Sequence, residues 1–202
     1  MKNYFDVGAN RGKYCLSWAS NNNLKIYAFE PNKILCDSLV KRAKNFPNCE
    51  IYNYAIDSTS GDKKFYISNN DACSSLLPFD EIGAKNWHSK LYTIREDVVQ
   101  SIRLDNFMEK NSIKKIDFLK IDTQGSDFEV IKSLGHKIVS VNKVLLEAFT
   151  TPKNKDLYVG EGKEKEITEY MLENDFRLNN RAYGGATNKF VNLEFINLRS
   201  LR

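Results

Sequence analysis

The stretch YFDVGANRG, residues 4–12, decides the fold expected for this chain. An apolar pair leads into Asp6, and three small or polar residues separate Gly8 from Gly12. This order is typical of a strand that stops, turns tightly and opens a helix, which is the ligand-binding corner of an open α/β sheet. The start of such a helix offers free N–H groups and a partial positive charge. The stretch therefore predicts a site for a small ligand that carries an anionic group.

Strand-like and helix-like segments alternate along the rest of the chain. Strands are expected at residues 2–7, 25–30, 49–56, 63–68, 98–104, 115–122 and 143–149, followed by a closing hairpin of FRLNNRAY (176–183) and KFVNLEFINL (189–198). Helices are expected at residues 12–20, 31–45 with Pro31 in the first turn, 105–111, 126–135 with Gly135 as the C-cap, and 164–176. With no internal repeat and no linker, this alternation predicts one α/β domain over residues 1–202.

Residues 69–97 interrupt the alternation. They hold Pro78, Gly83, polar clusters and scattered aromatic residues, without sustained periodicity. Irregular segments of this length are often functional loops. We expect an irregular insertion that forms a lid over a substrate, and we expect His88 within it to be an ordinary loop residue.

Composition and charge fit a globular protein with no membrane span. The chain has 202 residues, of which 42% are hydrophobic and 12% aromatic, as in a protein with a full core. No apolar run approaches the roughly 20 residues of a membrane helix, and Asp6 and Arg11 interrupt any signal-peptide pattern. A cytoplasmic location is therefore expected.

The net charge of +4 is spread over interleaved signs, as in residues 163–166, which disfavours a nucleic-acid partner. The four cysteines show no zinc-ligand spacing, so no metal site is expected.

The glycine-rich turn departs from the dinucleotide pattern G-x-G-x-x-G. Asn10 stands where a glycine would let the backbone approach a pyrophosphate, and this disfavours a nicotinamide-dependent oxidoreductase. An acid at the mouth of the turn suits a ligand that has both an ammonium and a carboxylate, as the methionine arm of S-adenosylmethionine does. Asp6 is expected to orient the amine directly or through water, and the N–H groups near Asn10 and Gly12 are expected to face the carboxylate.

Two further positions complete the expected cofactor site. Glu30 ends the next strand, and a carboxylate there can accept both hydroxyls of a ribose. The end of the third strand, YNYAID, is expected beside the adenine, with Ala55 and Ile56 as its wall; for Ile56, ordinary core packing is the alternative. The expected cofactor-binding residues are Asp6, Gly8, Asn10, Gly12, Glu30, Pro31, Ala55 and Ile56.

Four motifs together closely resemble the FkbM-type S-adenosylmethionine-dependent methyltransferases. They are DVGANRG (6–12), AFEPN (28–32), RLDNF (103–107) and IDFLKIDTQGSDFEVIKSLG (116–135). The resemblance covers residues 4 to 150 or so, and it implies a class I methyltransferase fold, a Rossmann-like seven-stranded sheet with an antiparallel last strand. It also implies methylation of an oxygen, often a sugar or polyketide hydroxyl. The family commonly has an acid where this chain has Gln124, which weakens any acidic role for that position.

Carboxylates at strand ends are the expected catalytic groups. Methyl transfer to oxygen needs an aligned acceptor and benefits from a general base. Asp122 closes the KIDFLKID strand, and Lys120 lies two residues earlier on the same face. Glu147 lies near the end of the neighbouring strand, so Asp122 and Glu147 are expected to face each other across the cleft. One of them is expected to act as the base while the other orients the sugar. For Asp122 a cap of the helix that starts near Ser126 is the alternative, and for Lys120 a structural ion pair is the alternative.

The expected function is therefore O-methyl transfer from S-adenosylmethionine to a hydroxyl of a sugar, a glycan or a related small molecule. One alternative is a methyltransferase for the 2′-hydroxyl of RNA ribose, although no basic stripe supports it. A second alternative is a non-catalytic cofactor-binding protein, against which the intact Asp6, Gly8, Gly12 and Glu30 count.

Overall fold

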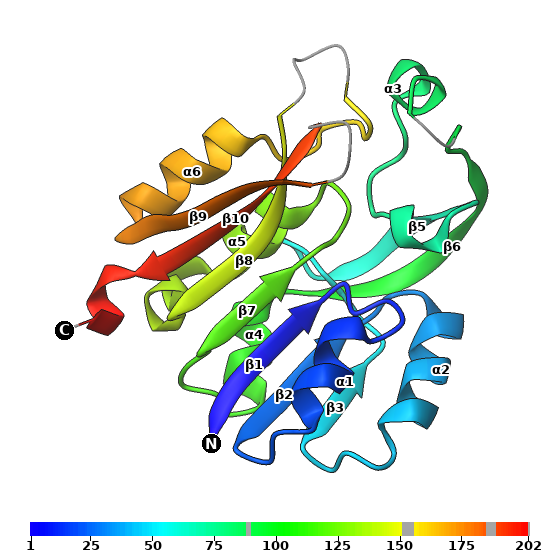
Figure 1. The fold of residues 1–202 in the computed structure, drawn as a ribbon. Coiled ribbons are helices and arrows are strands. Elements are labelled where there is room, and N and C mark those ends of the chain that lie inside the picture. Colours follow the sequence, from blue (N-terminus) through cyan, green and yellow to red (C-terminus); the bar gives the residue numbers. More distant parts are fainter. Residues whose placement is uncertain (88–89, 151–155, 185–188, 202) are drawn as a thin grey trace.

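The computed structural model describes residues 1–87, 90–150, 156–184 and 189–201. Seven strands form one sheet in the order β3-β2-β1-β7-β8-β10-β9 (Figure 1). Their bounds are β1 Lys2–Val7, β2 Leu24–Phe29, β3 Cys49–Tyr52, β7 Phe118–Ile121, β8 Lys143–Phe149, β9 Phe176–Gly184 and β10 Phe190–Asn197. The first five in spatial order are parallel, and β10 runs antiparallel to both β8 and β9. This confirms the expected seven-stranded sheet with an antiparallel last strand.

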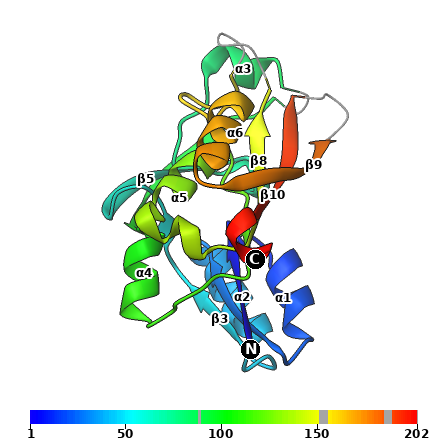
Figure 2. The ribbon, with the colours of Figure 1, turned by 90° about the vertical axis from the view of Figure 1, so that its left-hand side faces the viewer.

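Helices cover both faces of the sheet. The α-helices are α1 Lys13–Ala19, α2 Lys33–Ala43, α3 Glu81–Lys85, α4 Leu104–Lys110, α5 Asp127–Lys132 and α6 Glu164–Glu173, and the 3-10 helices are η1 Asp71–Cys73, η2 Gly135–Ser140 and η3 Leu198–Leu201. Helix α1 lies on one side of the sheet, and α4 and α5 lie on the other (Figure 2). Buried apolar residues of the central strands, such as Phe5, Leu119 and Leu146, form the core between these layers.

The register of the central strands brings three loops to one edge of the sheet. Val7 at the end of β1 lies opposite Phe29 of β2 and Ile121 of β7. These strands therefore end at the same level, and the residues that follow them gather in the crevice where an open α/β sheet binds its ligand.

A second sheet, in the order β4-β6-β5, stands beside this edge (Figure 1). Its strands are β4 Ala55–Ile56, β5 Gly61–Ser68 and β6 Thr93–Ile102. The expectation of one continuous strand over residues 49–56 was wrong. The chain leaves the large sheet at Asn53, whose side-chain amide donates to the carbonyl oxygens of Glu30 and Pro31, both at 2.9 Å.

The segment 69–97 is more regular than its sequence indicates. It contains η1, α3 and the first residues of β6, which begins at Thr93 and not at residue 98. Strand β6 pairs with β5 along its length, from Thr93 opposite Ser68 to Ser101 opposite Gly61. The pairing partner lies in an earlier part of the chain, so local periodicity does not reveal it. His88 lies outside the described residues, as do residues 185–188 of the expected hairpin turn.

Several expected boundaries shift by a few residues. Helix α2 begins after Asn32, whose side chain caps the N–H of Ile34 at 3.1 Å, so Pro31 precedes the cap. Helix α5 ends at Lys132 with Ser133 as its C-cap, and Gly135 instead opens η2 with a φ of +49°.

Replacing Gly8 with alanine is expected to destabilise the fold by about 3 kcal/mol. The residue has a φ of +74°, and a Cβ there would lie 1.9 Å from the backbone oxygen of Asp122. Gly160 is the matched control, because it has a φ of +78° and a Cβ added there would meet nothing within 4 Å. Gly160→Ala is expected to cost about 1 kcal/mol. Urea unfolding measures both, and equal losses would contradict the close approach of β1 and β7.

Candidate active site

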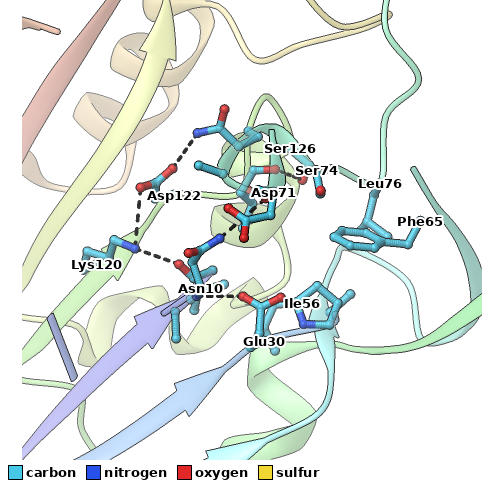
Figure 3. Close-up of a pocket in the computed structure, with 18 of the residues that line it drawn as sticks. Asn10, Glu30, Ile56, Phe65, Asp71, Ser74, Leu76, Lys120, Asp122 and Ser126 are labelled. Carbon is cyan, nitrogen blue, oxygen red and sulfur yellow. Dashed lines mark hydrogen bonds and ion pairs between the residues drawn. The ribbon is translucent and has the colours of Figure 1, made fainter. Parts of the chain in front are cut away.

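A cavity of about 290 Å³ lies at the ends of β1, β2 and β7, against the small sheet (Figure 3). Of the residues expected at the cofactor, those that line it are Gly8, Asn10, Glu30, Pro31, Ala55 and Ile56. Lys120 and Asp122 line it as well, whereas Asp6, Gly12 and Glu147 do not. Most of the positions expected from three separate motifs thus meet in one space.

Glu30 is a buried carboxylate at the end of β2. It is 4% exposed, and its two oxygens accept the backbone N–H groups of Asn10 at 2.7 Å and Asn32 at 2.8 Å. Burial, opposed by these hydrogen bonds, raises the pKa of Glu30 to about 7. A carboxylate oxygen can accept more than one hydrogen bond, so each keeps capacity for a ligand hydroxyl.

The N–H groups of the glycine-rich turn are used within the chain. Asn10 donates to Glu30, Arg11 donates to the Asn10 side chain at 2.8 Å, and Gly12 donates to the Ala9 carbonyl at 2.8 Å. The expectation that the N–H groups of Asn10 and Gly12 face a ligand carboxylate does not match this geometry. Gly12 packs beneath the turn, where a Cβ would meet Leu39 at 2.3 Å.

Asp6 and Lys120 form a buried ion pair below the cavity. Asp6 is fully buried, and its Oδ2 accepts the N–H of Cys15 at 3.0 Å. Its Oδ1 lies 3.0 Å from Lys120 Nζ, as an ion pair without hydrogen-bond geometry. Asp6 is therefore not placed to touch a ligand amine directly, so the direct contact expected for it is wrong, and the contact through water stays a prediction. Its negative charge instead faces the lysine that lines the cavity floor.

Lys120 connects this pair to the cavity. Its Nζ donates to the Gly8 carbonyl at 3.0 Å and lies 3.7 Å from Asp122 Oδ2. Burial alone would lower the pKa of Lys120, but the carboxylates of Asp6 and Asp122 outweigh burial and raise it. The lysine is thus a fixed positive charge between two acids.

Replacing Lys120 with methionine is expected to destabilise the protein by about 3–5 kcal/mol, because Asp6 would keep a buried charge without a counter-ion. The double variant Asp6→Asn, Lys120→Met is expected to recover most of this loss. Lys64→Met, which breaks an exposed pair with Glu96, is the control and is expected to cost less than about 1 kcal/mol. Chemical denaturation measures all three, and a Lys120→Met loss as small as the control's would contradict the pairing.

The far wall of the cavity is apolar. Ala55 and Ile56 of β4 lie where the sequence predicts an adenine contact, and Phe65 of β5 and Leu76 complete the wall (Figure 3). Sequence reasoning missed Phe65 and Leu76. Phe65 had a signal, because it alternates with Ile67 in KKFYIS and both are buried, whereas Leu76 comes from the irregular segment and had none.

Asp122, Gln124 and Glu147 form a polar cluster at the other end of the cavity. The Gln124 amide nitrogen donates to Asp122 Oδ1 at 2.8 Å and to Glu147 Oε2 at 3.4 Å. The two acids expected to face each other across the cleft are therefore bridged by an amide. Burial, reinforced by Asp122 and Asp127, raises the pKa of Glu147 to about 9. The side chain of Asp122 is 43% exposed, and it does not cap α5.

Asp127 holds the loop beneath this cluster. Its Oδ2 accepts from the N–H and hydroxyl of Thr123 at 3.0 and 2.7 Å, and its Oδ1 accepts the N–H of Glu147 at 3.1 Å. Burial raises the pKa of Asp127 to about 6. Within the described residues, no group of three or more His, Cys, Asp and Glu side chains is arranged to hold a metal ion.

Two members of the cluster were missed from the sequence. Gln124 was considered only as a departure from an acid, although its place directly after a buried strand end was the available signal. The single hydroxyl proton of Tyr158 has two acceptors within reach, the Cys73 carbonyl oxygen at 2.9 Å and Gln124 Oε1 at 3.2 Å. It lies on the loop before α6, and no local pattern marks it.

A sheet of this order, with a cavity at the ends of β1, β2 and β7, is the fold of the class I methyltransferases. Within that class, the chain belongs to the FkbM methyltransferase family, because the family model of the methyltransferase FkbM domain matches residues 6–178. The predicted family, fold and cofactor are thereby confirmed.

Among curated proteins, the chain is 29% identical over 181 residues to the hexuronic acid methyltransferase AglP of Haloferax volcanii, covering 88% of this chain and 70% of that protein. Among solved structures, TrmK of M. capricolum bound to S-adenosylhomocysteine is similar with a TM-score of 0.53 and 12% identity, over 97% of this chain and 62% of that one. Fibrillarin of Aeropyrum pernix with bound S-adenosylmethionine has a TM-score of 0.56 and 9% identity, over 96% and 66% of the two chains. Identities this low show the fold alone.

Proposed function

We propose that this protein transfers a methyl group from S-adenosylmethionine to a hydroxyl of a sugar, a glycan or a related small molecule. The observation that carries this proposal is the Asp122 carboxylate. It lines the same cavity as Glu30 and is 43% exposed, so it can contact an acceptor held beside a bound donor. The name of the 29% identical relative, a hexuronic acid methyltransferase, supports a sugar acceptor.

The cavity supports one arrangement of the cofactor. Glu30 would accept the ribose hydroxyls, and Ala55, Ile56 and Phe65 would pack against the adenine. The methionine arm would then lie toward Lys120, where its carboxylate can meet the Lys120 ammonium. S-adenosylmethionine supplies an electrophilic methyl group on a sulfonium.

The protein's own contribution is alignment and proton removal. An acceptor hydroxyl held by Asp122 would be positioned for in-line attack on the methyl group. Asp122 would take the hydroxyl proton as the O–C bond forms. Glu147, behind the Gln124 amide, would stay protonated at neutral pH, because its pKa is raised to about 9 by burial and nearby acids.

Segment 69–87 and the loop 156–163 are proposed as the cover on the acceptor side. Asp80 N–H donates to the Leu157 carbonyl at 2.9 Å, and Val159 N–H donates to the Pro78 carbonyl at 3.0 Å. The ring of Phe79 stacks on Tyr158 with centroids 5.1 Å apart. These contacts join the two segments next to the cluster of Asp122, Gln124 and Glu147, which is where a lid over an acceptor would lie.

Incubation with S-adenosylmethionine and p-nitrophenyl β-D-glucuronide, followed by mass spectrometry, tests the proposed function. The expected result is a product heavier by one methylene group, together with S-adenosylhomocysteine. The product is expected to survive mild alkali, as a methyl ether does. A product that alkali cleaves is a methyl ester, and it would contradict transfer to a hydroxyl.

RNA ribose methylation is the second candidate, and the pairing of Lys120 with Asp122 at 3.7 Å is the one observation that favours it. Salt-sensitive binding of a single-stranded RNA would support it. Binding of the cofactor without transfer to sugars or to RNA would instead favour a non-catalytic protein.

We also propose a cytoplasmic setting. All four cysteines are free thiols, and Cys15, Cys36 and Cys49 are buried, as expected for a protein kept in a reducing compartment. Within the described residues, no helix has both the length and the apolar character to cross a membrane.

A further inference from the structure

The Gln124 side-chain amide lies between two acids, Asp122 and Glu147, and donates a hydrogen bond to each. Its amide nitrogen carries two hydrogens, one directed at Asp122 Oδ1 (2.8 Å) and the other at Glu147 Oε2 (3.4 Å). Its amide oxygen lies 3.2 Å from the hydroxyl of Tyr158, whose single proton it shares with the Cys73 carbonyl oxygen at 2.9 Å. Both amide hydrogens and one lone pair of the amide oxygen therefore have a partner.

The orientation of this amide is determined by its neighbours. A flipped amide would point its oxygen at two carboxyl groups and its nitrogen at the Tyr158 hydroxyl. That hydroxyl would still have the Cys73 carbonyl as an acceptor at 2.9 Å, but the Asp122 carboxylate would lose its donor and face the amide oxygen. Electrostatics thus favours the orientation in which the nitrogen faces Asp122 and Glu147.

The backbone of Gln124 is held in a conformation that non-glycine residues rarely adopt. Its φ is +57°, and such a conformation persists where the surroundings fix it. The Ser75 hydroxyl donates to the Gln124 carbonyl at 2.7 Å, and the N–H of Gly162 donates to the Gly125 carbonyl at 2.8 Å. Each of the two segments proposed as the acceptor-side cover therefore donates a hydrogen bond to this turn.

The charge around Gln124 explains why a neutral donor suits this place. Asp122 and Glu147 accept its two amide hydrogens, and the charges of Asp122, Asp127, Glu161 and Lys120 all act on Glu147. Burial and the nearby acids raise the pKa of Glu147, so a further negative charge at position 124 would be disfavoured. An amide supplies hydrogen bonds at every pH and adds no charge.

We propose that Gln124 is a positioning residue that fixes the Asp122 carboxylate for the acceptor, with the Tyr158 hydroxyl fixing the amide in turn. Asp122 is then held from two sides, by Lys120 at Oδ2 and by Gln124 at Oδ1. This inference rests on the proposed function, because it assigns Asp122 to the acceptor. Through Tyr158, a loop of the proposed lid would therefore help to align the acceptor with the methyl group.

The first test compares kinetic constants for methyl transfer to p-nitrophenyl β-D-glucuronide. Gln124→Met keeps the side-chain length and removes the hydrogen bonds, and it is expected to lower kcat about 100-fold, while the affinity for S-adenosylhomocysteine changes less than about twofold. Tyr158→Phe keeps the ring stacked on Phe79 and is expected to lower kcat about 10-fold. Gln100→Met, the same substitution at an exposed position of β6, is the matched control and is expected to leave kcat unchanged.

The pH profile separates positioning from general structural damage. In Gln124→Glu the introduced carboxyl can donate to Asp122 only while it is protonated, so kcat is expected to fall with rising pH as it ionises beside Asp122, Glu147 and Asp127. A structural defect would lower kcat equally at every pH. Equal kcat and equal pH profiles in wild type and Gln124→Glu would overturn the proposal.

A second measurement does not depend on the acceptor. In protein labelled with ¹⁵N-glutamine, the Gln124 side-chain amide hydrogens are expected to exchange with water at least about 10-fold more slowly than those of Gln100, whose amide pairs with Asp62 on the exposed face of β6. Tyr158→Phe is expected to accelerate the exchange at Gln124. Exchange of the Gln124 amide hydrogens as fast as at Gln100 would overturn the proposal that this amide is fixed in place. Slow exchange at Gln124 in a protein that transfers no methyl group would support the hydrogen bonds of this amide and contradict the proposed function.

Discussion

Glu30→Ala is expected to weaken the binding of S-adenosylhomocysteine by at least about 100-fold. A carboxylate that accepts two ribose hydroxyls makes charge-assisted hydrogen bonds worth about 3 kcal/mol together. The same carboxylate holds the N–H groups of Asn10 and Asn32 at 2.7 and 2.8 Å. Its removal therefore loses the ribose contact and loosens the turn after β1 at once. Isothermal titration calorimetry measures the loss.

Two controls separate these contributions. Glu30→Gln keeps the volume but places an amide NH₂ against a backbone N–H, and we expect a loss close to that of alanine. Glu169→Ala, at an exposed position of α6 that pairs with Lys165, is expected to bind as the wild type does. Unchanged affinity in Glu30→Ala, with the protein folded, would remove Glu30 from the cofactor site.

The pKa of Glu30, raised to about 7, predicts a pH dependence of the same binding. Below pH 7 the carboxyl is mostly protonated, so the affinity is expected to fall about tenfold from pH 8 to pH 6. In Glu30→Gln this pH dependence should disappear, because no group at residue 30 titrates. A wild-type affinity that stays level across this range would contradict the buried, ribose-binding carboxylate.

The sequence predicts those parts of the fold whose signals are local. The strand-turn-helix at residues 4–12 and the acid at Glu30 could be placed because parallel strands end at one level. Strand β8 Lys143–Phe149 matches its expected bounds, since a continuous apolar run with a clear end is enough to define a buried strand. The turn after β1, the end of β2 and the end of β7 bring Gly8, Glu30 and Asp122 to one cavity.

The remaining features depend on contacts between distant residues. The small sheet forms because β6 pairs with β5, and no periodicity within residues 69–97 indicates that pairing. Asp6 was assigned to the ligand because an acid at a strand end resembles a ligand contact. Asp6 instead pairs with Lys120, its neighbour on the adjacent strand. Spacing in the sequence does not show with which of two acids a buried lysine will pair. Tyr158 reaches Gln124 from 34 residues away in the chain.

Asp122→Asn is expected to lower kcat for methyl transfer about 1000-fold, the range that removal of a general base produces. Asparagine keeps the volume and can still accept from Gln124, but its amide cannot take the hydroxyl proton. The affinity for S-adenosylhomocysteine is expected to change less than about threefold, since the backbone of residue 122, which approaches Gly8, is unaltered. Asp37→Asn on the exposed face of α2 is the control for a lost surface charge.

The division between binding and turnover makes this variant decisive. A loss of cofactor affinity as large as the loss of kcat would place Asp122 at the donor's methionine arm and not at the acceptor. Wild-type kcat in Asp122→Asn would leave Glu147 as the acid closest to the acceptor, and Glu147→Gln would then be expected to abolish transfer. The expected outcome is the reverse, because Asp122 is 43% exposed beside the cavity, whereas Glu147 lies behind the Gln124 amide and is expected to keep its proton.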